Sequence, residues 1–207
     1  MKYANDKQIL EKLDMSGRRL SHTKAVADEC DELAKLFKLS EADAEMLHTA
    51  ALLHDCTKEY KAADQVKLCE KYGIKYTRDD LDSPKVFHAV TGAAYAKDVF
   101  GASDEICACI AKHTTGSPDM TLCEKLLYLA DYIEATRTFD DCVALRKFFH
   151  KAVEKSAKPL SDILCDTLIL SFDMTIKNLL SDGETVHPAT IEARNSLIRQ
   201  KKQESDK

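Results

Sequence analysis

Histidine and aspartate residues are the side chains of this sequence whose types and spacing could do chemistry. Six of them lie in or beside apolar stretches with helical periodicity: His22, His54, Asp55, His88, His113 and Asp131. Taken singly, each one fits a hydrogen-bonded core residue, a helix cap or an ion-pair partner. Taken together, they would cost several kcal/mol each if they were buried without partners. A shared metal ion would neutralise the carboxylates and use the imidazole lone pairs, so the set indicates a metal centre.

The adjacent pair His54 and Asp55 is the most informative part of this set, because it follows the apolar run AALL. Neighbouring helical residues point about 100° apart, since an α-helix has 3.6 residues per turn. Both side chains can bind one metal only if the metal lies between their directions. Ligands from several other helices would then complete the shell, as in metal sites in the cores of helical bundles.

Helices are the elements that must position these side chains. The segment 119–158 contains neither glycine nor proline, and no region alternates apolar and polar residues with the period of a strand. Ser16 and Ser40 are predicted N-caps. Helices are predicted over residues 6–13, 16–37, 40–54, 61–72, 86–100, 103–112, 121–137, 141–158, 160–180 and 188–200. We predict an all-α, single compact domain over residues 1–200, a loop over 74–85 and a charged tail over 201–207.

Composition excludes several classes of protein. The 207 residues are 44% hydrophobic and 31% charged, which is not the composition of a disordered chain. No apolar run approaches the roughly 18 residues of a membrane span, and the charged start shows no secretory signal. The net charge of −5 argues against a general nucleic-acid binder. A cytoplasmic protein without a membrane or nucleic-acid partner is expected, and homodimer formation stays open.

Eight cysteines form no CxxC pair, and most of them fall within apolar helical patterns. Cys107 and Cys109 are two residues apart, so they would point to different sides of a helix. A zinc knuckle is therefore disfavoured. We predict reduced thiols that fill the core.

Longer motifs carry a resemblance to a known family. The order H…HD…D resembles the HD-domain metal-dependent phosphohydrolase superfamily. The segments AALLHDCTKEY, FHAVTGAAYA, IAKHTTGSPDMTLCEKLLYLADYIEATR and VHPATIEARNSL resemble the YqeK family, over about residues 16–198. That family is described as hydrolysing diadenosine tetraphosphate symmetrically to two ADP, so the resemblance implies an HD-domain helical bundle with a nucleotide substrate.

The resemblance also implies the ligand sets of two metal ions. His22, His54, Asp55 and Asp131 would hold the first, and His88 and His113 would hold the second, with Asp55 bridging both. The metal of the family is thought to be iron, whereas imidazole by itself accepts iron, zinc, manganese or nickel. Two metals about 3.5–4 Å apart can lower the pKa of a bridging water. The resulting hydroxide would attack phosphorus in line and expel a nucleoside diphosphate.

Substrate-binding residues follow from their position beside these ligands. Lys58 lies one turn after His54, Arg137 lies six residues after Asp131, and Arg19 lies one turn before His22. Each could neutralise phosphate charge, and the alternative for each is a solvated surface cation. Asp55 and Lys58 are the predicted catalytic residues.

Other residues near these ligands each have two possible roles. The turn of Thr114, Thr115 and Gly116 could bind phosphate oxygens, or it could simply end a helix with glycine as the cap, and the resemblance favours the phosphate-binding role. Glu134 could orient a ligand or pair with Arg137. Tyr128 and Tyr132 could stack on a base or fill the core.

The remaining alternatives concern the reaction and the other histidines. A different HD phosphohydrolase, acting on deoxynucleotides or guanosine alarmones, would share the first metal shell. A sensing domain would lack phosphate-orienting groups, and a structural scaffold would leave the histidines and aspartates unexplained.

His48 is either a residue that supports the ligands or a helix-surface residue. His150 is predicted on the surface, and His187 is predicted to be structural at a helix start.

Overall fold

The computed structural model describes residues 6–205, and every regular element in that range is a helix. The all-α prediction is therefore confirmed. The elements are α1 Asp6–Lys12, α2 Gly17–Leu36, α3 Glu41–Leu53, α4 Ala62–Tyr72, α5 Arg78–Asp82, the 3-10 helix η1 Pro84–Val86, α6 Phe87–Phe100, α7 Asp104–Lys112, α8 Leu122–Ile133, α9 Asp140–Lys155, α10 Leu160–Ser181 and α11 Pro188–Ser205.

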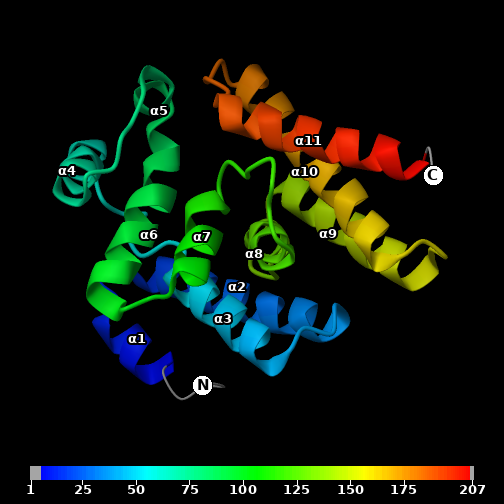
Figure 1. Ribbon diagram of the computed structural model, residues 1–207, viewed down its shortest axis with the longest axis horizontal. Coiled ribbons are helices and arrows are strands. Elements are labelled where there is room, and N and C mark those ends of the chain that lie inside the picture. The colour runs from blue at the N-terminus through cyan, green and yellow to red at the C-terminus, as the bar shows by residue number, and fades with distance from the viewer. Residues whose placement is uncertain (1–5, 206–207) are drawn as a thin grey trace.

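Helix α8 lies at the centre of the bundle and connects its two sides (Figure 1). It packs against the antiparallel pair of α2 and α3, against α7, and against α9 and α10. The α6–α7 pair carries α4 on its outer side, and α10 pairs with α11 at the other end of the molecule. Leu126, Leu127 and Leu129 are fully buried on several sides of α8, as expected for a helix surrounded by others.

Local sequence signals explain where the site-bearing helices begin. The Ser16 hydroxyl accepts a hydrogen bond from the backbone N–H of Arg19, and Ser40 does the same for Asp43, so both predicted N-caps are confirmed. Thr121 and Glu124 form a reciprocal capping box at the start of α8. These caps place the first turns of three helices that carry His22, His54 and Asp131.

The predicted helix boundaries differ from the observed ones by three residues or more in four places, of which the end of α9, at Lys155 instead of residue 158, is the smallest. The stretch 74–85 is not all loop, because Thr77 and Asp80 form a capping box that begins α5, and Pro84 begins η1. Helix α8 ends at Ile133 rather than at Arg137, since the backbone of Glu134 leaves the helical region. Helix α11 continues through Ser205 into the segment predicted as a tail, whose last two residues lie outside the described range.

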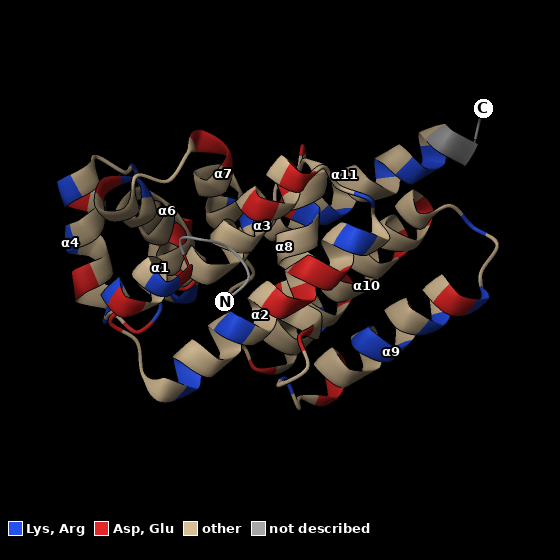
Figure 2. Cartoon of the chain, turned by 90° about the horizontal axis from the view of Figure 1, so that it is seen from below, with Lys and Arg blue, Asp and Glu red and all other residues tan. Residues whose placement is uncertain are grey.

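The eight cysteines are free, and six of them are buried, which agrees with the prediction of reduced thiols in the core. No helix within residues 6–205 is both long and apolar enough to cross a bilayer. Lysine, arginine, aspartate and glutamate are interspersed along α2, α4 and α9 (Figure 2).

Candidate metal centre and its cavities

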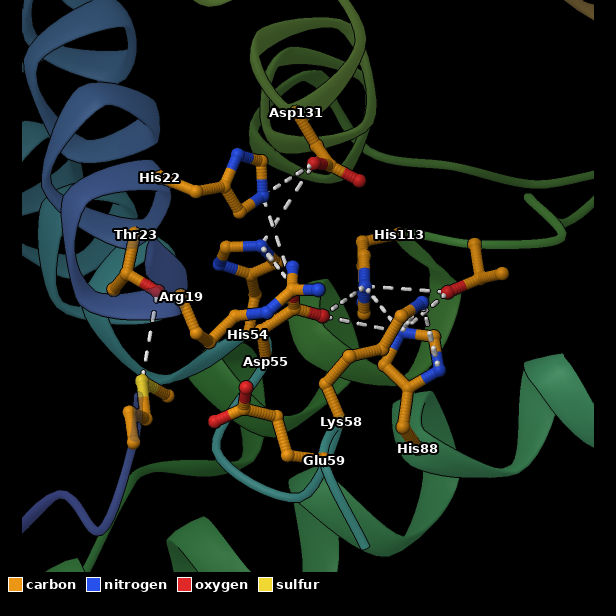
Figure 3. A network of polar contacts seen from close by, with 12 residues as sticks. Arg19, His22, Thr23, His54, Asp55, Lys58, Glu59, His88, His113 and Asp131 are labelled. Carbon is orange, nitrogen blue, oxygen red and sulfur yellow. Dashed lines mark hydrogen bonds and ion pairs between the residues drawn. The ribbon is translucent and has the colours of Figure 1, made fainter. Parts of the chain in front are cut away.

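Five helices and the turn that follows α3 bring the six predicted ligands into a single cluster (Figure 3). His22 comes from the second turn of α2, His54 ends α3, and Asp131 comes from the last turn of α8. Nε2 of His22 lies 3.0 Å from Oδ1 of Asp131 and 3.7 Å from Oδ2 of Asp55. Nε2 of His54 lies 3.4 Å from Oδ2 of Asp55 and 3.8 Å from Oδ1 of Asp131. These atoms form one group that could hold a cation.

A second group lies on the other side of Asp55. Nε2 of His88, from α6, lies 3.2 Å from Oδ1 of Asp55, and Nε2 of His113, at the end of α7, lies 3.6 Å from the same oxygen. The two imidazole nitrogens are 3.1 Å apart. Asp55 therefore presents Oδ2 to the first group and Oδ1 to the second, which is the arrangement that a bridging carboxylate requires.

The four histidines are oriented by oxygen atoms behind them. Nδ1 of His54 lies 2.7 Å from the carbonyl of Ala51, and His88 and His113 repeat this contact with the carbonyls three residues earlier, at 2.7 and 2.6 Å. Nδ1 of His22 lies 3.1 Å from Oε1 of Glu134. A carbonyl or a carboxylate only accepts, so each Nδ1 carries a proton and each Nε2 faces the cluster. This is the usual orientation of histidine ligands in metal sites.

The polar atoms at the centre of the cluster fit a metal ion. Nε2 of His22, Nε2 of His54 and Oδ1 of Asp55 are buried and have no hydrogen-bond partner. Buried polar atoms without partners are costly, and a cation between them would satisfy all three. Imidazole nitrogen with carboxylate oxygen is a donor set that suits iron, manganese, zinc or nickel.

Charges within the cluster shift the pKa values of the predicted ligands. Burial opposes ionisation of Asp55, but His54, His113 and His88 hold its pKa well below the usual range. Burial lowers the pKa of His88 to about 4, with help from Lys58 and His113 and against the effect of Asp55, so this ring is neutral at pH 7. The cluster is thus a buried anion surrounded by imidazole nitrogens.

His22 shifts in the opposite direction. Burial lowers its pKa, but the carboxylates of Asp131 and Glu134, at 3.0 and 3.1 Å from the two ring nitrogens, outweigh burial and raise the pKa to about 9. A metal ion would have to displace this proton, so we expect cation binding to release it.

All three predicted phosphate-binding cations lie at the cluster. Arg19 forms an ion pair through Nη1 with Oδ2 of Asp55, and Arg137 donates from Nη2 to Oδ1 of Asp131 at 2.6 Å. Nζ of Lys58 lies 3.1 Å from Nε2 of His88. Burial lowers the pKa of Lys58, although Asp55 and Asp131 oppose that shift. These cations contact the predicted ligands, so the interpretation of solvated surface cations is wrong for all three.

The three residues that follow His113 have different roles. Oγ1 of Thr114 lies 3.2 Å from Nε2 of both His88 and His113, so this hydroxyl faces the cluster. Thr115 instead donates its hydroxyl to the carbonyl of Gly116. Gly116 donates its N–H to the carbonyl of Lys112 and has φ +70°, and a Cβ there would lie 2.6 Å from the Phe172 ring. The N–H of Gly116 is not available to a phosphate, so this residue ends the helix and allows close packing.

Two cavities open on either side of Arg137 and Phe139. We call the first the α2–α8 cavity. It has a volume of about 660 Å³ and is lined by residues that include Arg18, Arg19, Ser21, Glu59 and Thr138. We call the second the α8–α10 cavity. It has a volume of about 360 Å³ and extends from Lys58 and Thr114 to Asp141, Asn178 and Asp182. Both reach the cluster, since His22 lines the first and His113 and Asp131 line the second.

Comparisons with known proteins agree with this geometry. The HD domain family matches residues 19–136, a range that contains all six clustered residues. The chain belongs to the HD-domain family. Proteins named symmetrical bis(5′-nucleosyl)-tetraphosphatase are 32% identical in Halalkalibacterium halodurans, over 93% of this chain and 96% of that protein, and 31% identical in Bacillus subtilis, over 90% and 93%. A crystal structure described as a predicted HD superfamily hydrolase involved in NAD metabolism, from Clostridium acetobutylicum, is 34% identical with a TM-score of 0.82, over 96% of this chain and 98% of that one.

One residue beyond the matched range has a role that sequence reasoning missed. Arg146, on α9, donates from Nε to the carbonyl of Ile133 and from Nη2 to the carbonyls of Glu134 and Arg137. These carbonyls end α8 and begin the following loop, so Arg146 caps the helix that carries Asp131 and fixes the loop that carries Arg137. No local signal points to it, because it is held by packing between α8 and α9.

The structure places His48 in neither of its two predicted positions and places Tyr128 in one of its two. His48 is neither on the surface nor beside the clustered ligands, since it is buried between Asp31 and Asp6, at 3.1 and 3.2 Å. It therefore links α1, α2 and α3. Tyr128 is buried against Phe172, with ring centroids 4.7 Å apart, which supports the alternative that its side chain fills the core.

Proposed function

We propose that this chain is a metal-dependent hydrolase that cleaves diadenosine tetraphosphate symmetrically to two ADP. The observation that carries the proposal is Asp55, whose two oxygens face two separate groups of histidine nitrogens beside three cations. The names of the similar proteins from two bacteria support the choice of substrate. The free buried thiols support a reducing compartment, and we place the protein in the cytoplasm.

We further propose that the site holds two metal ions and that the metal is iron. His22, His54 and Asp131 would hold one ion, His88 and His113 would hold the other, and Asp55 would contact both. The nitrogen and oxygen donor set and the absence of cysteine from it support this choice over structural zinc. When bound, two such metals supply a water nucleophile at neutral pH and offset negative charge on phosphorus-bound oxygens.

The chain's own side chains bind and orient the polyphosphate. Arg137 and Lys58 lie at the inner end of the α8–α10 cavity, beside the cluster, and Arg19 lies in the α2–α8 cavity. Cations on both sides of the cluster would neutralise the phosphates that precede and follow the reacting phosphorus. Thr114 would donate its hydroxyl to a phosphate oxygen, and Thr115 would contribute only by shaping the turn.

The proposal is tested by incubating anaerobically purified protein with diadenosine tetraphosphate and separating the products. Metal content is measured on the same sample. Two ADP per substrate, with close to two iron ions per chain, is the expected result. AMP with ATP would overturn symmetric cleavage. Hydrolysis of deoxynucleotides or guanosine alarmones in place of diadenosine tetraphosphate would show that the chain is a different HD phosphohydrolase.

A further inference from the structure

The charge of the side chains that line the α8–α10 cavity changes from one end to the other. Its inner end, at the metal centre, carries the cations Lys58 and Arg137 and the hydroxyl of Thr114. Its outer end carries the carboxylates of Asp141 and Asp182 and the amide of Asn178. A polyphosphate would be attracted to the inner end and repelled by the outer one. The cavity volume of about 360 Å³ lies within the range of small-molecule sites, about 300–1,000 Å³.

Asp141 is held in a fixed position at this outer end. Its Oδ2 accepts hydrogen bonds from the hydroxyl of Tyr132, at 2.7 Å, and from the amide of Asn178, at 3.0 Å. Its Oδ1 accepts from the backbone N–H of Cys142 at 2.8 Å. A carboxylate offers about four acceptor positions, so one remains for a further donor. Such an oriented carboxylate is the group that binds ribose hydroxyls in dinucleotide sites.

Phe139 stands between the two cavities and lines both of them. It is 61% exposed, which is unusual for a large aromatic side chain and leaves its ring open to a planar ligand. Tyr132 adds a second, half-buried ring in the α8–α10 cavity. Stacking on an aromatic ring tolerates any nucleobase, because every base has a π-face.

The α2–α8 cavity is lined by more cations than carboxylates. Arg18, Arg19 and Arg137 line it, and they face the carboxylates of Glu59 and Glu134 together with serine and threonine hydroxyls. Three arginines match an extended polyphosphate better than a neutral nucleoside.

We propose that the α8–α10 cavity is a nucleoside site, in which Asp141 accepts a hydrogen bond from a ribose hydroxyl and Phe139 and Tyr132 contact the base. The phosphates attached to this nucleoside extend inward past Arg137 and Lys58, and the remaining phosphates of the substrate enter the α2–α8 cavity. This assignment rests on the proposed function for the identity of the ligand, and it adds the residues that recognise the nucleoside.

The experiment compares three ligands by titration calorimetry with the metal-loaded protein: ADP, 2′,3′-dideoxy-ADP and pyrophosphate. The wild type is expected to bind ADP about tenfold or more tightly than the dideoxy form, because hydrogen bonds to charged groups are among the stronger ones. In Asp141→Asn this preference is expected to fall to threefold or less, with pyrophosphate binding unchanged. Asp140→Asn is the matched control, since Asp140 is an exposed neighbour that does not line the cavity.

Two outcomes would overturn the assignment. One is an unchanged preference for ADP in Asp141→Asn, which would place the ribose elsewhere. The other is equal loss of ADP and pyrophosphate binding, which would mean that Asp141 supports the metal end of the cavity instead. Phe139→Ala should weaken ADP and dideoxy-ADP alike and leave pyrophosphate unaffected. Because binding is measured without turnover, a wild type that shows this pattern and does not cleave diadenosine tetraphosphate would refute the proposed reaction while leaving the nucleoside site in place.

Discussion

Glu134 and His22 face each other across the interface between α8 and α2, with Oε1 of the carboxylate 3.1 Å from Nδ1 of the ring. The opposite nitrogen of the same ring points at Asp131 and Asp55. Glu134 is completely buried, and it also accepts hydrogen bonds from Thr136, so its own position is fixed. The carboxylate therefore determines which nitrogen of His22 is free to bind a metal.

Replacing this carboxylate should weaken metal binding without removing a ligand. We expect Glu134→Gln to lower metal affinity by about 10-fold to 100-fold, as loss of partners behind histidine ligands does elsewhere. The measurement is titration of the metal-free protein with Fe²⁺ or Mn²⁺. Glu154→Gln, on the exposed side of α9, is the control. Unchanged affinity in Glu134→Gln would show that His22 is not a ligand or is oriented by other groups.

Asp55 should be required by both metal ions. In Asp55→Asn only one oxygen remains, and the amide nitrogen must face one of the two histidine groups. We expect the bound metal to fall well below the wild-type amount, measured by elemental analysis of purified protein, with circular dichroism as a check of the fold. Asp104→Asn, whose side chain is 84% exposed, should keep its metal. A metal-replete, active Asp55→Asn or Asp55→Ala variant would refute the bridging assignment.

Lys58 should act on the substrate and not on the metal. Lys58→Ala is expected to retain bound metal and to lose kcat/KM by about tenfold or more, which corresponds to about 1.4 kcal/mol of transition-state stabilisation. Its ammonium group lies at the inner end of the α8–α10 cavity, 3.1 Å from Nε2 of His88. Loss of metal in this variant would instead mean that Lys58 holds His88 in place.

The carboxyl group of Glu29 should make the fold less stable as the pH rises from about 4.5 to about 7. Burial raises its pKa to about 7, although Arg146 opposes this shift. Between an unfolded pKa near 4.5 and a folded pKa near 7, the folded chain binds more protons, so this group's contribution to stability falls as pH rises. We expect Glu29→Gln to raise the free energy of unfolding by about 1–3 kcal/mol at pH 8 and by much less at pH 5. Denaturant titrations at both pH values test this, and an equal effect at both would contradict it.

Gly116 and Gly183 allow backbone strain to be separated from crowding. Both have positive φ, +70° and +69°, but a Cβ at Gly116 would lie 2.6 Å from Phe172 and 3.0 Å from Ala193, whereas a Cβ at Gly183 would meet open space. We expect Gly183→Ala to cost about 1 kcal/mol and Gly116→Ala to cost about 2–4 kcal/mol, because the second adds overpacking to the strained backbone. Equal losses in thermal or denaturant unfolding would show that Phe172 moves aside freely.

The sequence by itself determined the helical class, the start of the site-bearing helices and the set of six residues that meet in the cluster. These features depend on residue type, on capping over three or four positions and on a period of 3.6 residues, all of which are local. The order of the histidines and aspartates then pointed to the HD-domain family, and the structure and the comparisons agree.

Only the tertiary structure decided how the two oxygens of Asp55 are divided, that α8 ends at Ile133, and that Arg146 holds that end. It also decided that Gly116 packs against Phe172 and that a cavity runs from Lys58 to Asp141. Each of these features joins residues from helices far apart in the chain. Their distances follow from how whole helices pack, and no spacing along one helix encodes that packing.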